Sequence, residues 1–224
     1  MNLRTLTCGI ILGLAGSVAI TGFLSTSAKA TIQPDTGEGM PAPSPEEMQK
    51  MMDAWADVMN PGPHHKLLNQ FVGSWDTKTK MWFGGPGTPA TESTGSSEIK
   101  WILDKHFIQE YAKSSFMMPD ATGNMNKIPF QGIGTTGYDN YRNLYTGIWM
   151  DSLGTQMPSM KESASPDGKK LTMYGEMDEP MLKVTGRMVK YVITIKDENH
   201  YTFESYDLHA GDNYKVMEIT YTRK

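Results

Sequence analysis

Apolar and polar residues alternate along most of His65–Lys224, as they do in β-strands that bury one face. Within Trp75–Phe83, every second residue falls on one face, while Asp76, Lys78 and Lys80 fall on the other. About ten strands without a helix between them predict an all-β fold, a closed antiparallel up-and-down β-barrel, because closure removes exposed sheet edges. The strands are expected at Trp75–Phe83, Thr94–Trp101, His106–Lys113, Phe130–Tyr138, Leu144–Asp151, Met157–Ser163, Lys170–Glu176, Lys183–Ile195, His200–His209 and Tyr214–Arg223.

The connections between these strands carry turn-forming residues. Ser165–Gly168 and Ala210–Asn213 are rich in Asp, Asn and Gly, which suits tight turns. The polar residues of Asp139–Asn143 are explained by a turn between two aromatic strands, with a polar binding rim as the alternative. Ser114–Ile128 is too long for a hairpin turn, so we expect a long loop that covers the barrel mouth.

Residues 1–30 have the pattern of a cleavable signal peptide. Arg4 precedes the apolar stretch Gly9–Leu24, and Ala28–Ala30 forms an A-x-A cleavage signal. Glycine, serine and threonine interrupt the apolar stretch, which favours cleavage over a transmembrane anchor. We therefore expect a periplasmic or secreted protein with no stable membrane span after cleavage. Its mature chain begins with a flexible leader rich in proline and glycine, residues 31–44.

A short amphipathic helix is predicted over residues 45–60. Ser44 and Glu47 have the spacing of a capping box, and Asn60–Pro63 ends the helix. The apolar stripe of this helix consists of Met48, Met51, Met52, Trp55 and Met59. We expect the barrel domain, residues 64–224, to cover this stripe, so that the helix acts as a brace, a plug or a lid; a dimer contact is the alternative.

The cysteine count and the charge exclude several functional classes. Cys8 is the only cysteine, so the mature chain has no disulfide framework, no thiol nucleophile and no cysteine-based metal site. Cleavage removes Arg4 and Lys29 but no acidic residue, which takes the net charge from −4 to −6. An acidic chain without a Lys/Arg cluster is a poor candidate for binding nucleic acid or an anionic membrane surface.

Four motifs are spread over residues 63–224: Pro63–Leu68 (PHHKLL), Phe71–Trp75 (FVGSW), Gly137–Asn140 (GYDN) and Lys215–Lys224 (KVMEITYTRK). Together they resemble domain-of-unknown-function family 1579, a bacterial family, often exported, that is placed with the calycin-like barrels. The resemblance covers about Pro63–Lys224. It implies a lipocalin-like barrel, and it brings no established substrate or catalytic residue.

Gly73–Trp75 is also similar to the G-x-W signature that opens calycin barrels. In those barrels the tryptophan closes the floor, and an arginine from the last strand stacks over its ring. Arg223 lies on the last predicted strand, so the resemblance implies a structural plug formed by Trp75 and Arg223. A guanidinium over an indole ring gains about 0.5–2 kcal/mol.

The barrel interior is the predicted ligand site, for a small apolar or amphipathic molecule. Aromatic walls with a few polar groups suit such a ligand, although aromatic residues in strands also pack ordinary cores. The cavity candidates are Trp101, Tyr111, Tyr138, Tyr145, Trp149 and Glu110.

Two chemical alternatives remain open from the residues. Paired carboxylates inside the cavity would support a hydrolase or isomerase; the strand glutamates are Glu110, Glu162, Glu176, Glu204 and Glu218. The histidines show no metal-ligand spacing. By analogy with a haem-binding calycin-like barrel, haem binding with His200 or His209 as the axial ligand is the second alternative. The residues predict no catalytic site.

Methionine is abundant, with 18 residues in the chain. Thioethers bind Cu(I), and the helix methionines lie close in sequence to His64 and His65. Adaptable apolar packing explains scattered methionines equally well, so no metal or cofactor is predicted. A protein-interaction module with a filled barrel is a further alternative. The oligomeric state does not follow from the sequence.

Overall fold

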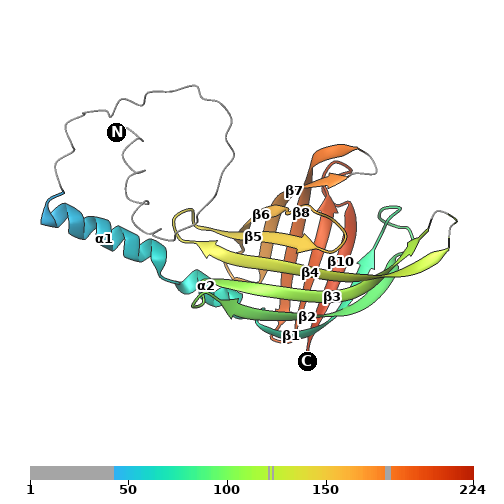
Figure 1. The fold of residues 1–224 in the computed structure, drawn as a ribbon, viewed down its shortest axis with the longest axis horizontal. Helices are drawn as coiled ribbons and strands as arrows, with labels where there is room; N and C mark the ends of the chain where they lie inside the picture. The colour runs from blue at the N-terminus through green and yellow to red at the C-terminus, as the bar shows by residue number, and fades with distance from the viewer. Residues whose placement is uncertain (1–42, 121, 123, 180–182) are drawn as a thin grey trace, which may run out of the picture. The chain divides into compact units, whose positions relative to one another are not determined.

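Ten antiparallel strands close into a single barrel in the computed structural model, which describes residues 43–120, 122, 124–179 and 183–224. Each strand pairs with the next one along the chain, and β1 pairs with β10 to close the barrel (Figure 1). The predicted fold class is therefore confirmed. The strands are β1 (Gly73–Met81), β2 (Thr91–Ile102), β3 (Phe107–Pro119), β4 (Met125–Asp139), β5 (Leu144–Asp151), β6 (Ser159–Ala164), β7 (Lys170–Glu179), β8 (Val184–Asp197), β9 (His200–Asp207) and β10 (Lys215–Arg223).

The predicted mouth loop at Ser114–Ile128 is wrong, because β3 and β4 continue through it as a long hairpin. Their pairing is continuous to the tip of the hairpin, where Pro119 lies opposite Met125. The Phe116 and Phe130 rings meet edge to face at 5.0 Å across the two strands, an aromatic cross-strand contact that favours pairing.

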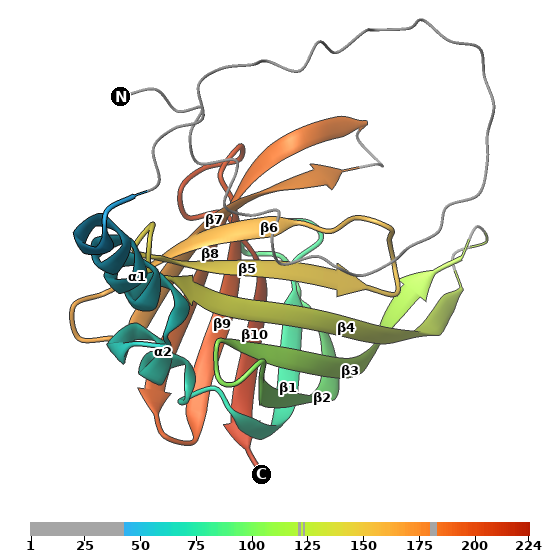
Figure 2. The ribbon, with the colours of Figure 1, turned by 60° about the vertical axis from the view of Figure 1, so that its left-hand side comes forward.

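A second helix, α2 (Pro63–Leu68), lies beside one end of the strands, as Figures 1 and 2 show. No helix was predicted here, because the first helix was expected to end at Asn60–Pro63 and residues 64–224 were assigned to the barrel domain. Leu68 of α2 is fully buried, and Phe71 follows it into the same apolar cluster with Trp75 and Tyr201. We call this end of the barrel the closed end.

The first helix, α1, spans Pro45–Met59, as predicted. Ser44 Oγ accepts a hydrogen bond from the Glu47 amide, and the Glu47 carboxylate accepts one from the Ser44 amide, so the capping box is confirmed. None of the residues of α1 is buried; Trp55 is 51 % exposed. The expectation that the barrel covers the apolar stripe is therefore wrong for the described part of the chain.

Contacts with the barrel are made at the C-terminal end of α1. Asn140 Nδ2 donates hydrogen bonds to the carbonyls of Asp57 and Asn60, both at 2.8–2.9 Å. His106 Nε2 lies 2.7 Å from the carbonyl oxygen of Met59. These contacts hold the end of the helix and leave its apolar face outside the core.

In the described residues, neither helix is long and apolar enough to cross a membrane. The predicted signal peptide (residues 1–30) and most of the predicted leader lie outside the described residues.

Candidate binding site in the barrel interior

Strand register identifies the side chains that face the barrel interior. Trp75 is buried inside the barrel and lies opposite Ser97, which in turn lies opposite Ala112. Directly opposed residues share a face of the sheet, and residues two apart along a strand share it as well. Glu110, two residues before Ala112, therefore points into the barrel, and Tyr111 points out.

Glu110 has two neutral hydrogen-bond donors as partners. Ser97 Oγ donates to Glu110 Oε1 at 2.7 Å, and the Tyr221 hydroxyl donates to the same oxygen at 3.1 Å. The other oxygen, Oε2, has no hydrogen-bond partner among the described residues, and none of the described lysines or arginines forms a salt bridge with it. Glu110 is thus an interior acid with one unused oxygen.

Burial raises the pKa of Glu110 above its ordinary value, and the hydrogen bonds from Ser97 and Tyr221 oppose that shift only in part. Burial also raises the pKa of the Tyr221 and Tyr201 hydroxyls well above the ordinary value, so both stay neutral. The Tyr201 and Tyr221 rings stack at 4.2 Å, which holds the Tyr221 hydroxyl in place beneath the carboxyl group.

The wall beside Glu110 carries a flat aromatic surface over glycine. Trp149 lies opposite Gly134, in the same interior row as Glu110. A Cβ atom added at Gly132 or Gly134 would meet the Trp149 indole, so this ring lies flat against the strand. The Trp149 and Phe130 rings are stacked at 6.4 Å, and Trp149 Nε1 donates to Asp151 Oδ2 at 3.0 Å.

Several inward-facing side chains around Glu110 are only partly buried. Glu110 itself and the inward-facing Trp149, Tyr191 and Phe203 all keep part of their accessible surface. At the closed end, by contrast, the inward-facing Trp75 is 1 % exposed. The partly accessible side chains around Glu110 are therefore the candidate lining of a ligand site.

A second interior polar atom lacks a partner. Ser93 lies opposite Thr79, which faces inward because it is four residues from Trp75 on the same strand. Its buried hydroxyl has no hydrogen-bond partner among the described residues. An unmet buried hydroxyl costs about 1–3 kcal/mol, so it is a further point where a polar group would be stabilised.

The structure divides the predicted cavity residues into three groups. Glu110 and Trp149 face the interior and remain partly accessible. Tyr138 and Tyr145 belong to the closed end: Tyr138 stacks on the His64 ring at 4.3 Å, and the Tyr145 hydroxyl donates to the His64 carbonyl at 3.1 Å.

Trp101 also lies at the closed end, where its Nε1 donates to Asn69 Oδ1 at 3.2 Å. Tyr111 does not line the interior: it is 48 % exposed, and its hydroxyl donates to Gln109 on the outer face of β3. Its neighbour Glu110 faces inward, so strand alternation places Tyr111 outside. Tyr221, Ser97 and Phe203 also face the interior but were not among the predicted cavity residues. Strand alternation, followed from Trp75 and Glu110 to the neighbouring strands, would have identified them.

The alternative chemistries find less support in the positions of their residues. Among the strand glutamates whose side chains are described, Glu176, Glu204 and Glu218 point outward, and Lys215 Nζ bridges the last two at 2.7 and 2.6 Å. His200 is outside the barrel, bonded to Asp197 at 2.8 Å, and His209 is exposed. Among the described residues, therefore, none of these glutamates and neither of these histidines lies beside Glu110 to form a catalytic pair.

The predicted plug of Trp75 and Arg223 is present. The two residues lie opposite each other on β1 and β10, and Arg223 Cζ is 4.1 Å from the centre of the Trp75 ring. Gly73 has a φ of 140°, and a Cβ atom there would collide with the Arg223 guanidinium. The glycine of the G-x-W signature is needed for this close approach.

Replacing Glu110 with glutamine is expected to change how stability depends on pH. A raised folded-state pKa stabilises the folded protein fully below the unfolded value of 4.5, and this contribution is lost as the pH rises through the folded pKa. Relative to Glu110→Gln, the wild type should therefore lose free energy of unfolding above pH 4.5, by about 1.4 kcal/mol for each unit that separates the two pKa values.

Urea unfolding across a pH series measures this difference. Glu98→Gln is the matched control, because Glu98 lies on the outer face of β2 with an exposed ion pair to Lys100 at 2.7 Å. Parallel curves for the wild type and Glu110→Gln would show that the Glu110 carboxyl is not perturbed.

The comparison with known families decides the membership of this chain. A family model described as "protein of unknown function (DUF1579)" matches residues 60–223. The chain belongs to the DUF1579 family. This agrees with the resemblance seen in the sequence over about Pro63–Lys224. No curated protein matches this DUF1579 member.

Several solved barrels are similar to the DUF1579 member in fold. The crystal structure of Rv2717c from M. tuberculosis is 12 % identical and has a TM-score of 0.49, covering 74 % of this chain and 99 % of that one. The S-type phycobiliprotein lyase CPES from Guillardia theta is 11 % identical with a TM-score of 0.43, covering 76 % and 96 %. A redesigned β-barrel, mFAP0, bound to DFHBI, is 14 % identical with a TM-score of 0.33, covering 69 % and 99 %. These identities are too low to transfer a ligand or a reaction.

Proposed function

We propose that this protein is an exported carrier that binds one small apolar or amphipathic molecule inside its barrel. The observation that carries the proposal is the unused Oε2 of Glu110, an interior carboxyl without a cationic partner in the described part of the chain, beside side chains that remain partly accessible. Buried polar groups are normally satisfied, so a ligand that supplies the missing hydrogen bond is stabilised there.

The interior also defines the chemistry of the ligand. Trp149, Tyr191 and Phe203 offer flat apolar surfaces to its body, the last two as rings stacked at 5.5 Å. With its raised pKa, the Glu110 carboxyl donates a hydrogen bond through Oε2 when protonated and accepts one when ionised. A ligand with an N–H or O–H group that both donates and accepts suits either state, whereas an anionic head would be repelled by the ionised form.

A carrier fits these positions better than a cavity enzyme. General acid–base catalysis needs a second group within reach of the reacting atoms. Among the described residues, Glu110 forms hydrogen bonds only with Ser97 and Tyr221. The signal-peptide pattern of residues 1–30 supports export of the carrier.

Binding of N-phenyl-1-naphthylamine tests the proposal, because this probe combines an aromatic body with one N–H group and fluoresces in apolar surroundings. We expect saturable binding by the wild type and about tenfold weaker binding by Glu110→Gln, which matches the loss of one hydrogen bond to a charged or strongly polar group. Glu98→Gln, on the outer face, should bind like the wild type.

Native mass spectrometry of protein purified gently from an exporting host provides the second measurement. A bound organic mass that is lost in Glu110→Gln would support a carrier. The proposal would be overturned if no bound mass is found and the wild type and Glu110→Gln bind the probe with the same affinity.

A further inference from the structure

A groove of about 660 Å³ lies at the closed end, outside the barrel and separate from the interior site. Its walls come from four places in the chain: α2 and the segment after it, the turn before β7, the end of β8 with the turn that follows it, and the end of β10. A groove of this volume is large enough for a small organic ligand.

Cationic side chains gather around this groove. Lys66, Lys169, Lys196 and Arg223 line it, against two carboxylates, Asp197 and Glu198. None of the three lysines forms a salt bridge with a described carboxylate. The groove thus carries an excess of two positive charges, although the whole chain has 21 basic and 25 acidic residues.

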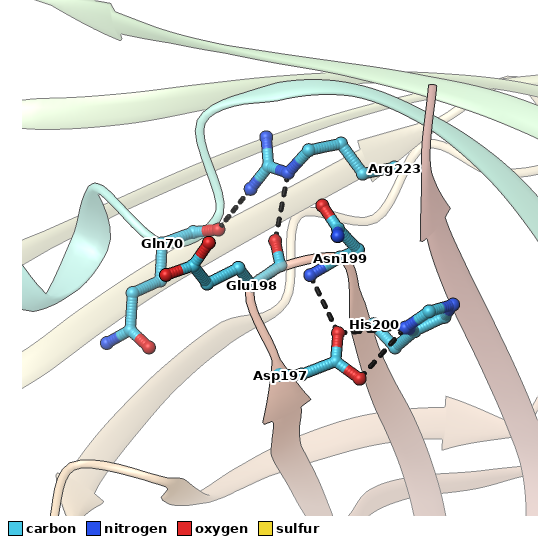
Figure 3. Close-up of polar contacts among 6 residues, drawn as sticks. All are labelled: Gln70, Asp197, Glu198, Asn199, His200 and Arg223. Atoms are coloured by element: carbon cyan, nitrogen blue, oxygen red, sulfur yellow. Dashed lines mark hydrogen bonds and ion pairs between the residues drawn. The ribbon is translucent and has the colours of Figure 1, made fainter.

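Asp197 is already engaged, since its carboxylate accepts hydrogen bonds from the Asn199 amide at 2.8 Å and lies 2.8 Å from His200 Nδ1. Figure 3 shows Asp197 turned toward His200, while the Arg223 guanidinium lies between Gln70 and Glu198. Arg223 is held there by hydrogen bonds from Nη2 to the Gln70 carbonyl and from Nε to the Glu198 carbonyl, both at 2.9 Å.

The groove also offers an apolar surface. Val72 and Ile195 line it between the charged groups, and both are partly accessible. A ligand with a short apolar body and a doubly charged head would bury the body on these residues and place its head among the lysines. Phosphate monoesters carry close to two negative charges at neutral pH, which matches the excess charge.

We infer that this groove is a second binding site, which takes a small phosphate monoester with an apolar substituent. Lys66, Lys169 and Lys196 bind the phosphate oxygens, and Val72 and Ile195 contact the substituent. The ligand differs from that of the interior, where the acidic Glu110 disfavours an anion.

Titration with phenyl phosphate, followed by calorimetry and by NMR of the amide groups, tests this site. Phenyl phosphate should bind more tightly than inorganic phosphate, and neutral benzyl alcohol should not bind the groove. The double variant Lys169→Gln/Lys196→Gln should weaken binding at least about tenfold, as expected for two charge-assisted contacts. Added salt should weaken it as well, because the lysines are solvent-exposed.

Two single variants serve as controls. Lys113→Gln removes an exposed lysine on β3, outside the groove, and Glu110→Gln alters the interior site; both should bind phenyl phosphate like the wild type. The backbone amides of Gln70 and Asn199 should shift in the wild type. The inference is overturned if millimolar phenyl phosphate shows no binding, if the double variant binds as tightly as Lys113→Gln, or if benzyl alcohol binds equally well.

Discussion

Replacing Trp75 with alanine is expected to lower the free energy of unfolding by about 3–5 kcal/mol. The Trp75 ring is 1 % exposed and meets the Tyr201 ring edge to face at 4.8 Å. Its Nε1 donates to the Phe71 carbonyl at 2.8 Å, which would lose its partner. The truncation therefore leaves a large cavity at the closed end, where the apolar core is most completely buried.

Urea unfolding followed by circular dichroism measures this loss. Trp55→Ala is the matched control, because Trp55 is the same residue type but lies 51 % exposed on α1. It should change the free energy of unfolding by less than about 0.5 kcal/mol. Similar losses in the two variants would show that Trp75 does not close the barrel.

Replacing Arg223 with alanine should lower the free energy of unfolding by about 1.5–3 kcal/mol. Besides stacking on Trp75, the guanidinium donates hydrogen bonds to the carbonyls of Val72 at 2.8 Å and of Gln70 and Glu198 at 2.9 Å. Part of this group reaches solvent, so water replaces some of the lost bonds and the effect stays below that of Trp75→Ala. Lysine at this position keeps the charge but lacks the planar guanidinium group. The free energy of unfolding of Arg223→Lys should therefore lie between those of the wild type and Arg223→Ala.

Arg142→Ala is the control for charge loss alone, because the Arg142 side chain is 65 % exposed and its ion pair with Asp139 is long, at 3.8 Å. A surface pair of this kind contributes little. Thermal melting of the three variants compares them directly. If Arg223→Ala and Arg142→Ala have the same melting temperature, the plug makes no contribution to stability.

The plug was predictable because the resemblance to calycin barrels implies both of its members, and both lie in strongly patterned strands. The G-x-W signature sets the face of Trp75, and the period of two sets the face of Arg223 on the last strand. Closure of the barrel then brings the two strands together, with Trp75 opposite Arg223.

The placement of Tyr111 could also have been derived from the sequence. Adjacent residues of a strand face opposite sides, so Glu110 and Tyr111 were not both candidates for the interior. Tyr138 and Tyr145 differ: both face inward, but α2 fills their end of the barrel. A six-residue helix between proline-rich turns and a strand has too short a pattern to be recognised with certainty.

The sequence by itself determined the strand pattern, the capped helix, the absence of cysteine from the predicted mature chain and the pairing at the plug, because each depends on neighbouring residues or on a known signature. Only the tertiary structure decided which inward-facing side chains remain accessible and what surrounds Glu110. The partners of Glu110 are 13 and 111 residues away, and the closed-end groove joins four separate segments. Such contacts exist only once all ten strands have closed in register, and local alternation carries no information about them.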